Sequence, residues 1–291
     1  MSPPTPASAL MPAEKVFRPP RDPDGLLVDL AETALEAARA AAAVLEEAID
    51  AELEVDTKIS ATDMVSDADF AAEAAVVETI RSRRPDDSVL GEEGTTQLGS
   101  SGIRWVVDPL DGTTNYLFGV PHFGVSVAAE VNGETAVGVV IDPCRDETWA
   151  AVRGWGARRN GIPRRVATDR STLDTALVAT GFGYLPARRA WQSHVLTKVL
   201  PVVRDVRRFG AAALDLCWTG AGRFDVYYEW GLNPWDLAAG ALVCSEAGGR
   251  VEALDGRLIL AAPEHLFGPM RELLESAGAL DAPAGPEPAN W

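Results

Sequence analysis

The chain has 291 residues, 47% of them hydrophobic, which is enough to bury the core of one or two domains. Acidic residues outnumber basic ones 43 to 26, and the formal charge of −17 argues against a nucleic-acid partner. No apolar run approaches the roughly 18 residues of a membrane span, and the signal-peptide pattern is absent, so we expect a cytoplasmic protein without a membrane partner. Three cysteines lack paired spacing and are expected to be buried: Cys144, Cys217 and Cys244.

Both ends of the chain are rich in proline or lack periodicity, so disordered tails are predicted over 1–24 and 277–291. Between them, apolar residues recur at helical spacing and predict a long amphipathic helix over 25–54. A second helix is predicted over 67–84. The first part of the fold is therefore expected to have two helices that pack against a sheet.

Short apolar runs follow, and a hairpin is predicted where Asn132 and Gly133 separate two of them. The strands expected in this half cover 88–91, 103–107, 123–131 and 136–141. In the second half, strands alternate with alanine-rich helices, which indicates an α/β layer. These strands are expected at 176–180, 204–208 and 224–228, and the helices at 210–222 and 235–247. We therefore predict an N-terminal α+β sub-domain over 25–165, carrying the metal ligands, and a C-terminal α/β sub-domain over 166–276.

The most informative segment is 105–116, which reads WVVDPLDGTTNY. An apolar strand delivers Asp108 to its end, Pro109 interrupts the strand, and Asp111 follows, so that two carboxylates face one small volume. The amides of 112–114 open a helical turn and can hold a phosphate. Oxygen ligands without a nearby histidine or cysteine favour Mg²⁺ over Zn²⁺. Taken alone, the segment also fits an ordinary turn.

Three further acidic segments stand at strand ends or helix starts. Glu92 follows the strand predicted at 88–91, although a solvated acidic loop explains it equally well. Asp236 precedes an apolar helix and fits either a metal ligand or a helix cap. Ser66 and Asp69 have the spacing of a capping box. Each has an adequate structural explanation, but their coincidence favours one shared metal site.

At this point the sequence resembles the inositol monophosphatase family. Three segments carry the resemblance: GEEG at 91–94, WVVDPLDGTTNY at 105–116 and WDLAAGALVCSEAGG at 235–249. Supporting stretches extend it over about 25–270, and ATGFGY at 179–184 is most similar to the actinobacterial inositol-1-monophosphatases. The resemblance implies a layered αβαβα sandwich and a Mg²⁺-dependent phosphatase that forms a homodimer. It also implies two to three ions, replaceable by Mn²⁺ and inhibited by Li⁺ or Ca²⁺.

The resemblance further implies a role for individual residues. Glu92, Asp108 and the carbonyl of Leu110 would hold the first metal ion; Asp108, Asp111 and Asp236 would hold the second; Glu92 and waters would hold a weaker third. Asp69 and Thr113 would activate the attacking water, with Lys58 on a nearby mobile loop. Contacts to the substrate would come from Asp111, Gly112, Thr113, Gly210, Ala211, Ala212, Glu229 and Asp236. Ala211 stands where relatives often have serine or threonine, which leaves a side-chain contact there in doubt.

The expected reaction is hydrolysis of inositol 1-phosphate, or of a similar small polyol monophosphate, by direct attack of water. Related substrates stay open: histidinol phosphate, fructose 1,6-bisphosphate and nucleotide 3′-phosphates. A haloacid-dehalogenase-type enzyme is the main rival, because Asp67 and Asp69 have its spacing, but TDMVS at 62–66 does not read as a buried strand. A non-catalytic regulatory member is a further alternative. The histidines are expected to be structural: His122, His194 and His265.

Overall fold

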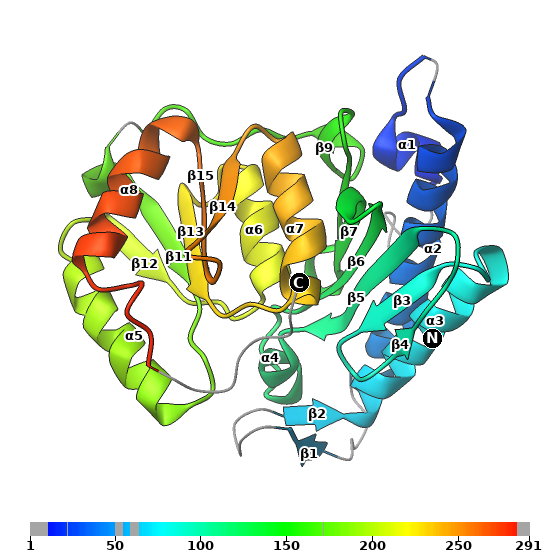
Figure 1. The fold of residues 1–291 in the computed structure, drawn as a ribbon, viewed down its shortest axis with the longest axis horizontal. Coiled ribbons are helices and arrows are strands. Elements are labelled where there is room, and N and C mark those ends of the chain that lie inside the picture. Colours follow the sequence, from blue (N-terminus) through cyan, green and yellow to red (C-terminus); the bar gives the residue numbers. More distant parts are fainter. Residues whose placement is uncertain (1–10, 22, 50–54, 59–63, 171, 284–291) are drawn as a thin grey trace.

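The protein, described by a computed structural model over residues 11–21, 23–49, 55–58, 64–170 and 172–283, has five alternating layers (Figure 1). Two helices cover the outer face of an eight-stranded sheet, two more lie between this sheet and a five-stranded sheet, and the last two cover the far face. In this order the pairs are α2 (Gly25–Ala48) with α3 (Asp67–Arg83), α6 (Ala212–Gly220) with α7 (Pro234–Glu246), and α5 (Pro186–Val199) with α8 (Glu264–Ser276). The predicted αβαβα sandwich is thereby confirmed.

The large sheet has the order β10-β9-β8-β7-β6-β5-β3-β4 and is antiparallel except between β3 and β5. Asn132 and Gly133 join β6 to β7 with φ angles of 53° and 84°, which confirms the predicted hairpin turn. The strands are β3 (Ser88–Gly91), β4 (Thr96–Gln97), β5 (Ile103–Asp111), β6 (Gly124–Val131), β7 (Glu134–Asp142), β8 (Glu147–Val152), β9 (Gly156–Arg159) and β10 (Ile162–Pro163).

The smaller sheet has the order β12-β11-β13-β15-β14 and mixes parallel and antiparallel pairs. Its strands are β11 (Leu177–Thr180), β12 (Asp205–Arg207), β13 (Val226–Trp230), β14 (Arg250–Leu254) and β15 (Leu258–Ala262). A two-stranded ribbon adds β1 (Val55–Thr57) and β2 (Met64–Ser66). The short helices are α1 (Ala13–Phe17) and α4 (Thr113–Leu117), with 3₁₀ turns at Pro143–Arg145 and Leu173–Thr175.

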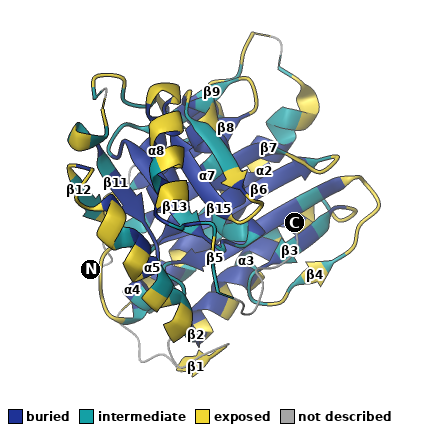
Figure 2. Cartoon of the chain, turned by 60° about the vertical axis from the view of Figure 1, so that its left-hand side comes forward, coloured by how far each residue is buried: buried dark blue, intermediate teal, exposed yellow. Residues whose placement is uncertain are grey.

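Small residues allow the layers to pack closely. The inward face of α2 is almost all alanine and leucine, so the helix approaches β6 and β7 without large side chains between them. Figure 2 shows the consequence: α7 and the central strands are buried, whereas α5 and α8 expose their outer faces. None of the described helices combines the length and apolar character that a membrane-spanning helix requires.

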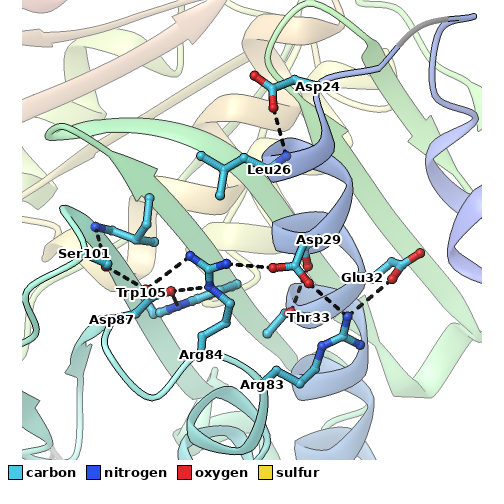
Figure 3. A network of polar contacts seen from close by, with 11 residues as sticks. Asp24, Leu26, Asp29, Glu32, Thr33, Arg83, Arg84, Asp87, Ser101 and Trp105 are labelled. Atoms are coloured by element: carbon cyan, nitrogen blue, oxygen red, sulfur yellow. Dashed lines mark hydrogen bonds and ion pairs between the residues drawn. The ribbon is translucent and has the colours of Figure 1, made fainter.

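A polar network fixes α2 and α3 against β5 (Figure 3). Arg84 donates to Asp29 of α2 at 2.7 Å and to Asp87 at 2.8 Å. Asp87 also accepts a hydrogen bond of 2.9 Å from the indole nitrogen of the fully buried Trp105 on β5. Because Trp105 lies three residues before Asp108, the network secures the strand that delivers Asp108 to its place.

Several boundaries differ from the predictions. Helix α2 ends at Ala48 rather than at 54, and 50–54 lie outside the described residues. The predicted N-terminal tail contains α1, whose Val16 and Phe17 are buried in the large core. At the other end, Ala277 and Ala279 are buried against α8 and its sheet. The order found at both ends has one cause. The apolar residues there are too few to form a periodic pattern in the sequence, and they are buried by elements distant in the chain.

Two further expectations need correction. Cys144 is exposed, unlike the buried Cys217 and Cys244, because it lies in the turn between β7 and β8. The expectation that no buried strand precedes Asp67 was wrong for residues 64–66, the described part of that segment. These residues form β2, in which Val65 and Ser66 are buried. This strand belongs to the two-stranded ribbon and not to a parallel sheet. The division into sub-domains at 165 stays a prediction.

Candidate active site

The parallel pairing of β3 and β5 brings two of the predicted metal ligands together. Gly91 is in register with Val107, and the next residue, Glu92, donates its N–H to the carbonyl of Val107 at 3.1 Å. Glu92 and Asp108 therefore leave neighbouring strands at the same edge. The β5–β6 register then shifts by one residue between Asp108 and Asp111, around Pro109, so the strand bulges where its carboxylates project.

The third carboxylate comes from the start of α7. Asn233 and Asp236 form a capping box, in which a carboxylate oxygen of Asp236 accepts the N–H of Asn233 at 2.7 Å. The hydroxyl of Ser126 donates to the carbonyl of Trp235 at 3.1 Å, and Ser126 is the residue paired with Asp108 across β5 and β6. This contact places the first turn of α7 beside Asp108. Asp236 is thus both a cap and a member of the cluster.

Glu92, Asp108 and Asp236 form a group whose ligand oxygens all lie within 4.8 Å of one another. Burial raises the pKa of Asp108 well above its usual range, and the nearby charges of Glu92 and Asp111 raise it further. Burial likewise raises the pKa of Asp236 to about 6. Carboxylates held this close must be neutralised by protons or by a cation, and the geometry fits a divalent metal ion with oxygen ligands.

Asp111 lies outside this group of three and has a second structural task. Its two carboxylate oxygens accept the N–H groups of Ala212 at 3.0 Å and Ala213 at 2.8 Å, in the first turn of α6. It therefore replaces the side-chain cap that Ala211, the N-cap residue, cannot provide. Burial raises the pKa of Asp111, the nearby Asp236 raises it further, and the two amides oppose the shift.

Asp69 and Thr113 meet beneath the cluster. One carboxylate oxygen of Asp69 accepts from the N–H and the hydroxyl of Ser66, at 2.8 and 2.6 Å, and completes the predicted capping box of α3. Its other oxygen lies 3.1 Å from the hydroxyl of Thr113, which also lies 3.0 Å from the carbonyl of Leu110. The Thr113 hydroxyl has one proton, so at any moment it can donate a hydrogen bond either to the carboxylate of Asp69 or to the carbonyl of Leu110.

A glycine shapes the turn that carries Thr113. Gly112 has φ of 96°, and a Cβ there would lie 3.2 to 3.3 Å from backbone atoms of His122, Gly210 and Phe123. Both the left-handed conformation and the close backbone contact favour glycine. The turn can therefore lie against the loop before α6 and keep the amides of Gly112 and Thr113 at the wall of the site.

Lys58 contacts the acidic loop after β3. Its ammonium group lies 2.9 Å from Glu92 and 2.8 Å from Glu93. Burial lowers the pKa of Lys58, but the two carboxylates more than compensate and raise it overall. Burial raises the pKa of Glu93 to about 7, and Glu92 adds to the effect. The neighbouring 59–63 lie outside the described residues, so the expected mobile loop stays a prediction.

Glu73 supports the Glu92 loop from α3, and the sequence analysis missed it. Its side chain is buried, and its two oxygens accept the N–H groups of Glu93 at 2.8 Å and Thr95 at 3.1 Å. A glutamate on the apolar face of α3 was the available signal, but its partners lie about 20 residues further along the chain. Glu73 thus holds the backbone on either side of Glu92, although it does not belong to the group of three carboxylates.

We expect Glu73→Gln to weaken magnesium binding about tenfold and to leave kcat at saturating magnesium nearly unchanged. The new amide nitrogen faces an N–H donor, so the loop loses one of its two anchors and Glu92 its fixed position. A titration of activity with magnesium measures the effect. The matched control is Glu78→Gln, an exposed position on the same helix. A Glu73 variant with a normal magnesium curve and normal stability contradicts this role.

The cluster opens into a cavity of about 500 Å³. Its wall includes most of the predicted site residues: Lys58, Glu92, Asp108, Leu110, Asp111, Gly112, Thr113, Gly210, Ala212, Glu229 and Asp236. Asp69 is fully buried below it and reaches it through Thr113. Ala211 does not line the cavity, and the N–H of Ala212 is already bonded to Asp111.

Glu229 stands on the wall contributed by the smaller sheet. It lies near the end of β13 and accepts a hydrogen bond of 2.8 Å from the hydroxyl of Tyr227. Burial raises the pKa of Glu229, while Tyr227 and Arg208 oppose the shift. The cavity therefore places the acidic cluster and a hydrogen-bond acceptor of the smaller sheet on the wall of one space. Its volume suits a small polar molecule.

The histidines do not belong to the metal group. His122 is buried between Phe209 and Trp218, and burial lowers its pKa to about 4, so its ring is neutral. His265 contacts the carbonyl of Arg170 at 2.8 Å, and His194 lies on the exposed side of α5. These placements agree with the structural role expected of all three.

In the presence of a chelator, we expect the melting temperature to fall as the pH rises from 5 to 8. The carboxyl pKa values are raised by folding, to about 6 for Asp236 and about 7 for Glu93. A raised pKa contributes stability below the pKa of the unfolded chain, and this contribution is lost as the pH rises through the folded value. Thermal unfolding at several pH values measures the slope.

Magnesium is the internal control for this prediction. A bound cation neutralises the carboxylates, so the stabilisation by magnesium should grow with pH over the same interval. A magnesium effect that is constant between pH 5 and 8 contradicts the electrostatic description of the cluster.

Three carboxylates gathered at the base of a polar cavity are typical of a metal-dependent hydrolase. Comparison with known proteins gives the family: a model described as the inositol monophosphatase family matches residues 27–283. The chain belongs to the inositol monophosphatase family and is a phosphoric monoester hydrolase, which confirms the resemblance found in the sequence.

Individual relatives agree. The chain is 44% identical over 207 residues to the inositol-1-monophosphatase SuhB of Mycobacterium tuberculosis, which covers 68% of this chain and 71% of the relative. It is 42% identical over 241 residues to a Nus factor SuhB of Pasteurella multocida, covering 79% and 90%. Among solved structures, SuhB of Mycobacterium tuberculosis aligns with a TM-score of 0.73 at 35% identity, over 90% of this chain and all 100% of that chain.

Proposed function

We propose that the protein hydrolyses inositol 1-phosphate, or a similar small polyol monophosphate, to the free alcohol and phosphate in a Mg²⁺-dependent reaction. The observation that carries the proposal is the convergence of Glu92, Asp108 and Asp236 above the Thr113–Asp69 pair at the base of one cavity. Water attacks the phosphorus directly, and the protein contributes position and charge.

The residues present fit magnesium ions. Glu92, Asp108 and the carbonyl of Leu110 would hold one ion, and Asp108, Asp111 and Asp236 would hold another. Asp111 retains lone pairs for this purpose, because each of its oxygens accepts one hydrogen bond from α6. When bound, Mg²⁺ supplies positive charge for the phosphoryl and leaving oxygens and makes water more acidic. The same proposal includes a weaker third ion held by Glu92. It also includes replacement of Mg²⁺ by Mn²⁺ and inhibition of the reaction by Li⁺ and Ca²⁺.

Asp69 and Thr113 would handle the proton. When the Thr113 hydroxyl donates to Asp69, a lone pair on its oxygen can accept a proton from the attacking water. Asp69 is itself oriented by two hydrogen bonds from Ser66, so it has little freedom to attack phosphorus. Lys58 would favour the ionised forms of Glu92 and Glu93 at the rim of the site and so oppose the effect of burial on their pKa values.

The substrate would span the cavity. The amides of Gly112 and Thr113 would contact its phosphate, while Glu229 would accept hydrogen bonds from hydroxyl groups of the leaving alcohol. Gly210 and Ala212 lie on the same wall. A contact from Ala211 is not part of this arrangement, since the residue is buried and its side chain is a methyl group.

A phosphate-release assay tests the proposal with inositol 1-phosphate, histidinol phosphate, fructose 1,6-bisphosphate and a nucleotide 3′-phosphate. The expected result is magnesium-dependent release that a chelator abolishes, with inositol 1-phosphate among the good substrates. Unchanged release in the presence of chelator, or no release from any of the four esters, would contradict it.

We expect a single inversion at phosphorus. Direct water attack inverts the configuration once, whereas an aspartyl-phosphate route of the haloacid-dehalogenase type involves two displacements and net retention. A chiral labelled phosphate ester, turned over in ¹⁸O-water, distinguishes them. Net retention, or an acyl phosphate trapped on Asp67 or Asp69, would restore the rival mechanism.

The partners are also proposals. A homodimer in the cytoplasm remains the expected state, and no nucleic-acid partner is expected from the charge of −17. The name Nus factor, carried by several relatives, describes those proteins. A role of that kind in this chain would have to use a surface other than the cavity, because the cavity wall is occupied by the proposed catalytic groups.

A further inference from the structure

A glycine makes room for the carboxyl group of Glu229 at the wall of the cavity. Strands β11 and β13 are parallel neighbours in which Thr180 is in register with Tyr228, so the next residues, Gly181 and Glu229, lie side by side. A Cβ at Gly181 would overlap the carboxyl group of Glu229. Gly181 does not have a positive φ angle, so this position needs glycine for space and not for its backbone conformation.

Tyr227 fixes one oxygen of this carboxyl group. It lies two residues before Glu229 on β13, so both side chains leave the same face of the strand. Its ring is fully buried, and its hydroxyl donates to Oε2 of Glu229 at 2.8 Å. Burial raises the pKa of Tyr227 well above its usual range, and Glu229 raises it further, so the hydroxyl keeps the proton for this hydrogen bond. Oε2 is therefore held from inside the fold.

The other oxygen of Glu229, Oε1, is left for a ligand. Within the part of the chain that the structure describes, Oε1 accepts no hydrogen bond and Glu229 forms no ion pair. Burial raises the pKa of Glu229, whereas Tyr227 and Arg208 favour the ionised form, which only accepts hydrogen bonds. Because Glu229 lines the cavity and is partly exposed, the natural partner of Oε1 is a donor group of the substrate.

The arrangement restricts how Glu229 can move. The strand fixes the base of the side chain, Tyr227 holds one oxygen, and the absent side chain of Gly181 leaves space for the carboxyl group. A carboxylate that is already held loses little further freedom when a ligand binds to it. Without the Tyr227 hydroxyl, the buried Oε2 would lack its donor, so the carboxyl group would be protonated more easily and would be less well oriented.

We propose that Tyr227 and Gly181 are positioning residues that determine specificity, because they hold Glu229 so that Oε1 accepts a hydrogen bond from a hydroxyl group of the leaving alcohol. This inference rests on the proposed function, since the phosphate of the same substrate must lie at the acidic cluster. A site built to accept a hydrogen bond discriminates against an analogue without the hydroxyl, because the acceptor then stays unpaired. Phosphate esters of polyols are thereby selected over esters of simple alcohols.

The test compares inositol 1-phosphate with cyclohexyl phosphate, which has the same six-membered ring without hydroxyl groups, on the full-length enzyme with magnesium. The wild-type kcat/KM should be at least about tenfold higher for inositol 1-phosphate, the usual effect of a hydrogen bond to a charged group. Tyr227→Phe keeps the ring and removes the donor to Oε2. It should raise KM for inositol 1-phosphate about tenfold, while its kcat and the kcat/KM for cyclohexyl phosphate change less than about twofold.

Gly181→Ala should shift the selectivity in the same direction. The added methyl group displaces the end of a flexible side chain, so Glu229 moves while the backbone keeps its place. A double-mutant cycle then shows whether Tyr227 acts through Glu229. Glu229→Ala alone should lower the ratio of the two esters, and the addition of Tyr227→Phe should lower it no further.

The matched control is Tyr228→Phe, which removes a buried hydroxyl one residue away. Tyr228 lies on the other face of β13, where its side chain hydrogen-bonds with Thr180. This variant should leave the ratio of the two esters unchanged, whatever it costs in thermal stability.

Four results would overturn the inference. They are an equal loss of activity on both esters in the Tyr227 variant, an unchanged ratio in the Tyr227 or Gly181 variant, additive effects in the double-mutant cycle, and a wild type without preference for inositol 1-phosphate. If Tyr227→Phe does not fold, Gly181→Ala decides by the same comparison. In each case magnesium-dependent turnover of inositol 1-phosphate by the wild type leaves the proposed function intact. No magnesium-dependent turnover of either ester would overturn both.

Discussion

Asp108→Asn is expected to lower kcat/KM at saturating magnesium by about a thousandfold and to leave the fold intact. Asp108 is the carboxylate proposed to contact both metal ions, and loss of such a ligand removes several kcal/mol of transition-state stabilisation. The asparagine oxygen can still accept the hydrogen bond of 3.0 Å from the N–H of Leu110, so the local backbone keeps its partner. Steady-state phosphate release measures the loss.

The same variant should be more stable than the wild type when metal is absent. Burial and the neighbouring Glu92 and Asp111 raise the pKa of Asp108, so its ionised form costs stability at neutral pH. The control is Asp225→Asn, also buried but paired with Arg170 at 2.6 Å, which should lose stability and keep its activity. More than about a tenth of wild-type turnover in the Asp108 variant contradicts the bridging role.

Asp69→Asn should lower kcat by a factor of about 10² to 10⁴, the usual contribution of a positioned base, with little change in KM. The asparagine cannot accept the proton that Thr113 would relay from the water. Because Asp69 also caps α3, the variant should lose about 1 kcal/mol of stability through the weakened capping box. Activity and thermal unfolding are therefore measured on the same preparation.

Two controls separate catalysis from capping. Ser66→Ala removes only the hydroxyl that donates to Asp69 at 2.6 Å, so it should lose stability while activity falls no more than a few fold. Thr113→Ser keeps the hydroxyl and should retain most activity, whereas Thr113→Ala should resemble the Asp69 variant. If Thr113→Ala remains active, the proposed proton path is wrong.

The local sequence was sufficient to predict the parts of the site that depend on neighbouring residues. The capping roles of Asp69 and Asp236 follow from residue types at helix starts. The predicted interruption at Pro109 was only partly right, because β5 continues to Asp111 and accommodates the proline with a bulge. Strand ends in register then bring Glu92 beside Asp108, which the carboxylate pattern indicated.

Tertiary structure decided what depends on distant partners. Asp111 caps a helix 101 positions further along the chain, and Glu73 holds a loop about 20 residues away. Arg188 of α5 and Arg208, which follows β12, line the same cavity although they come from different elements. The short helix α1 packs on the large core through Val16 and Phe17. Adjacent residues determine local propensity and hydrophobic periodicity, so both can be read from the sequence. The contacts listed above form only when folding brings remote segments together. A local sequence pattern does not indicate which of these segments will be in contact.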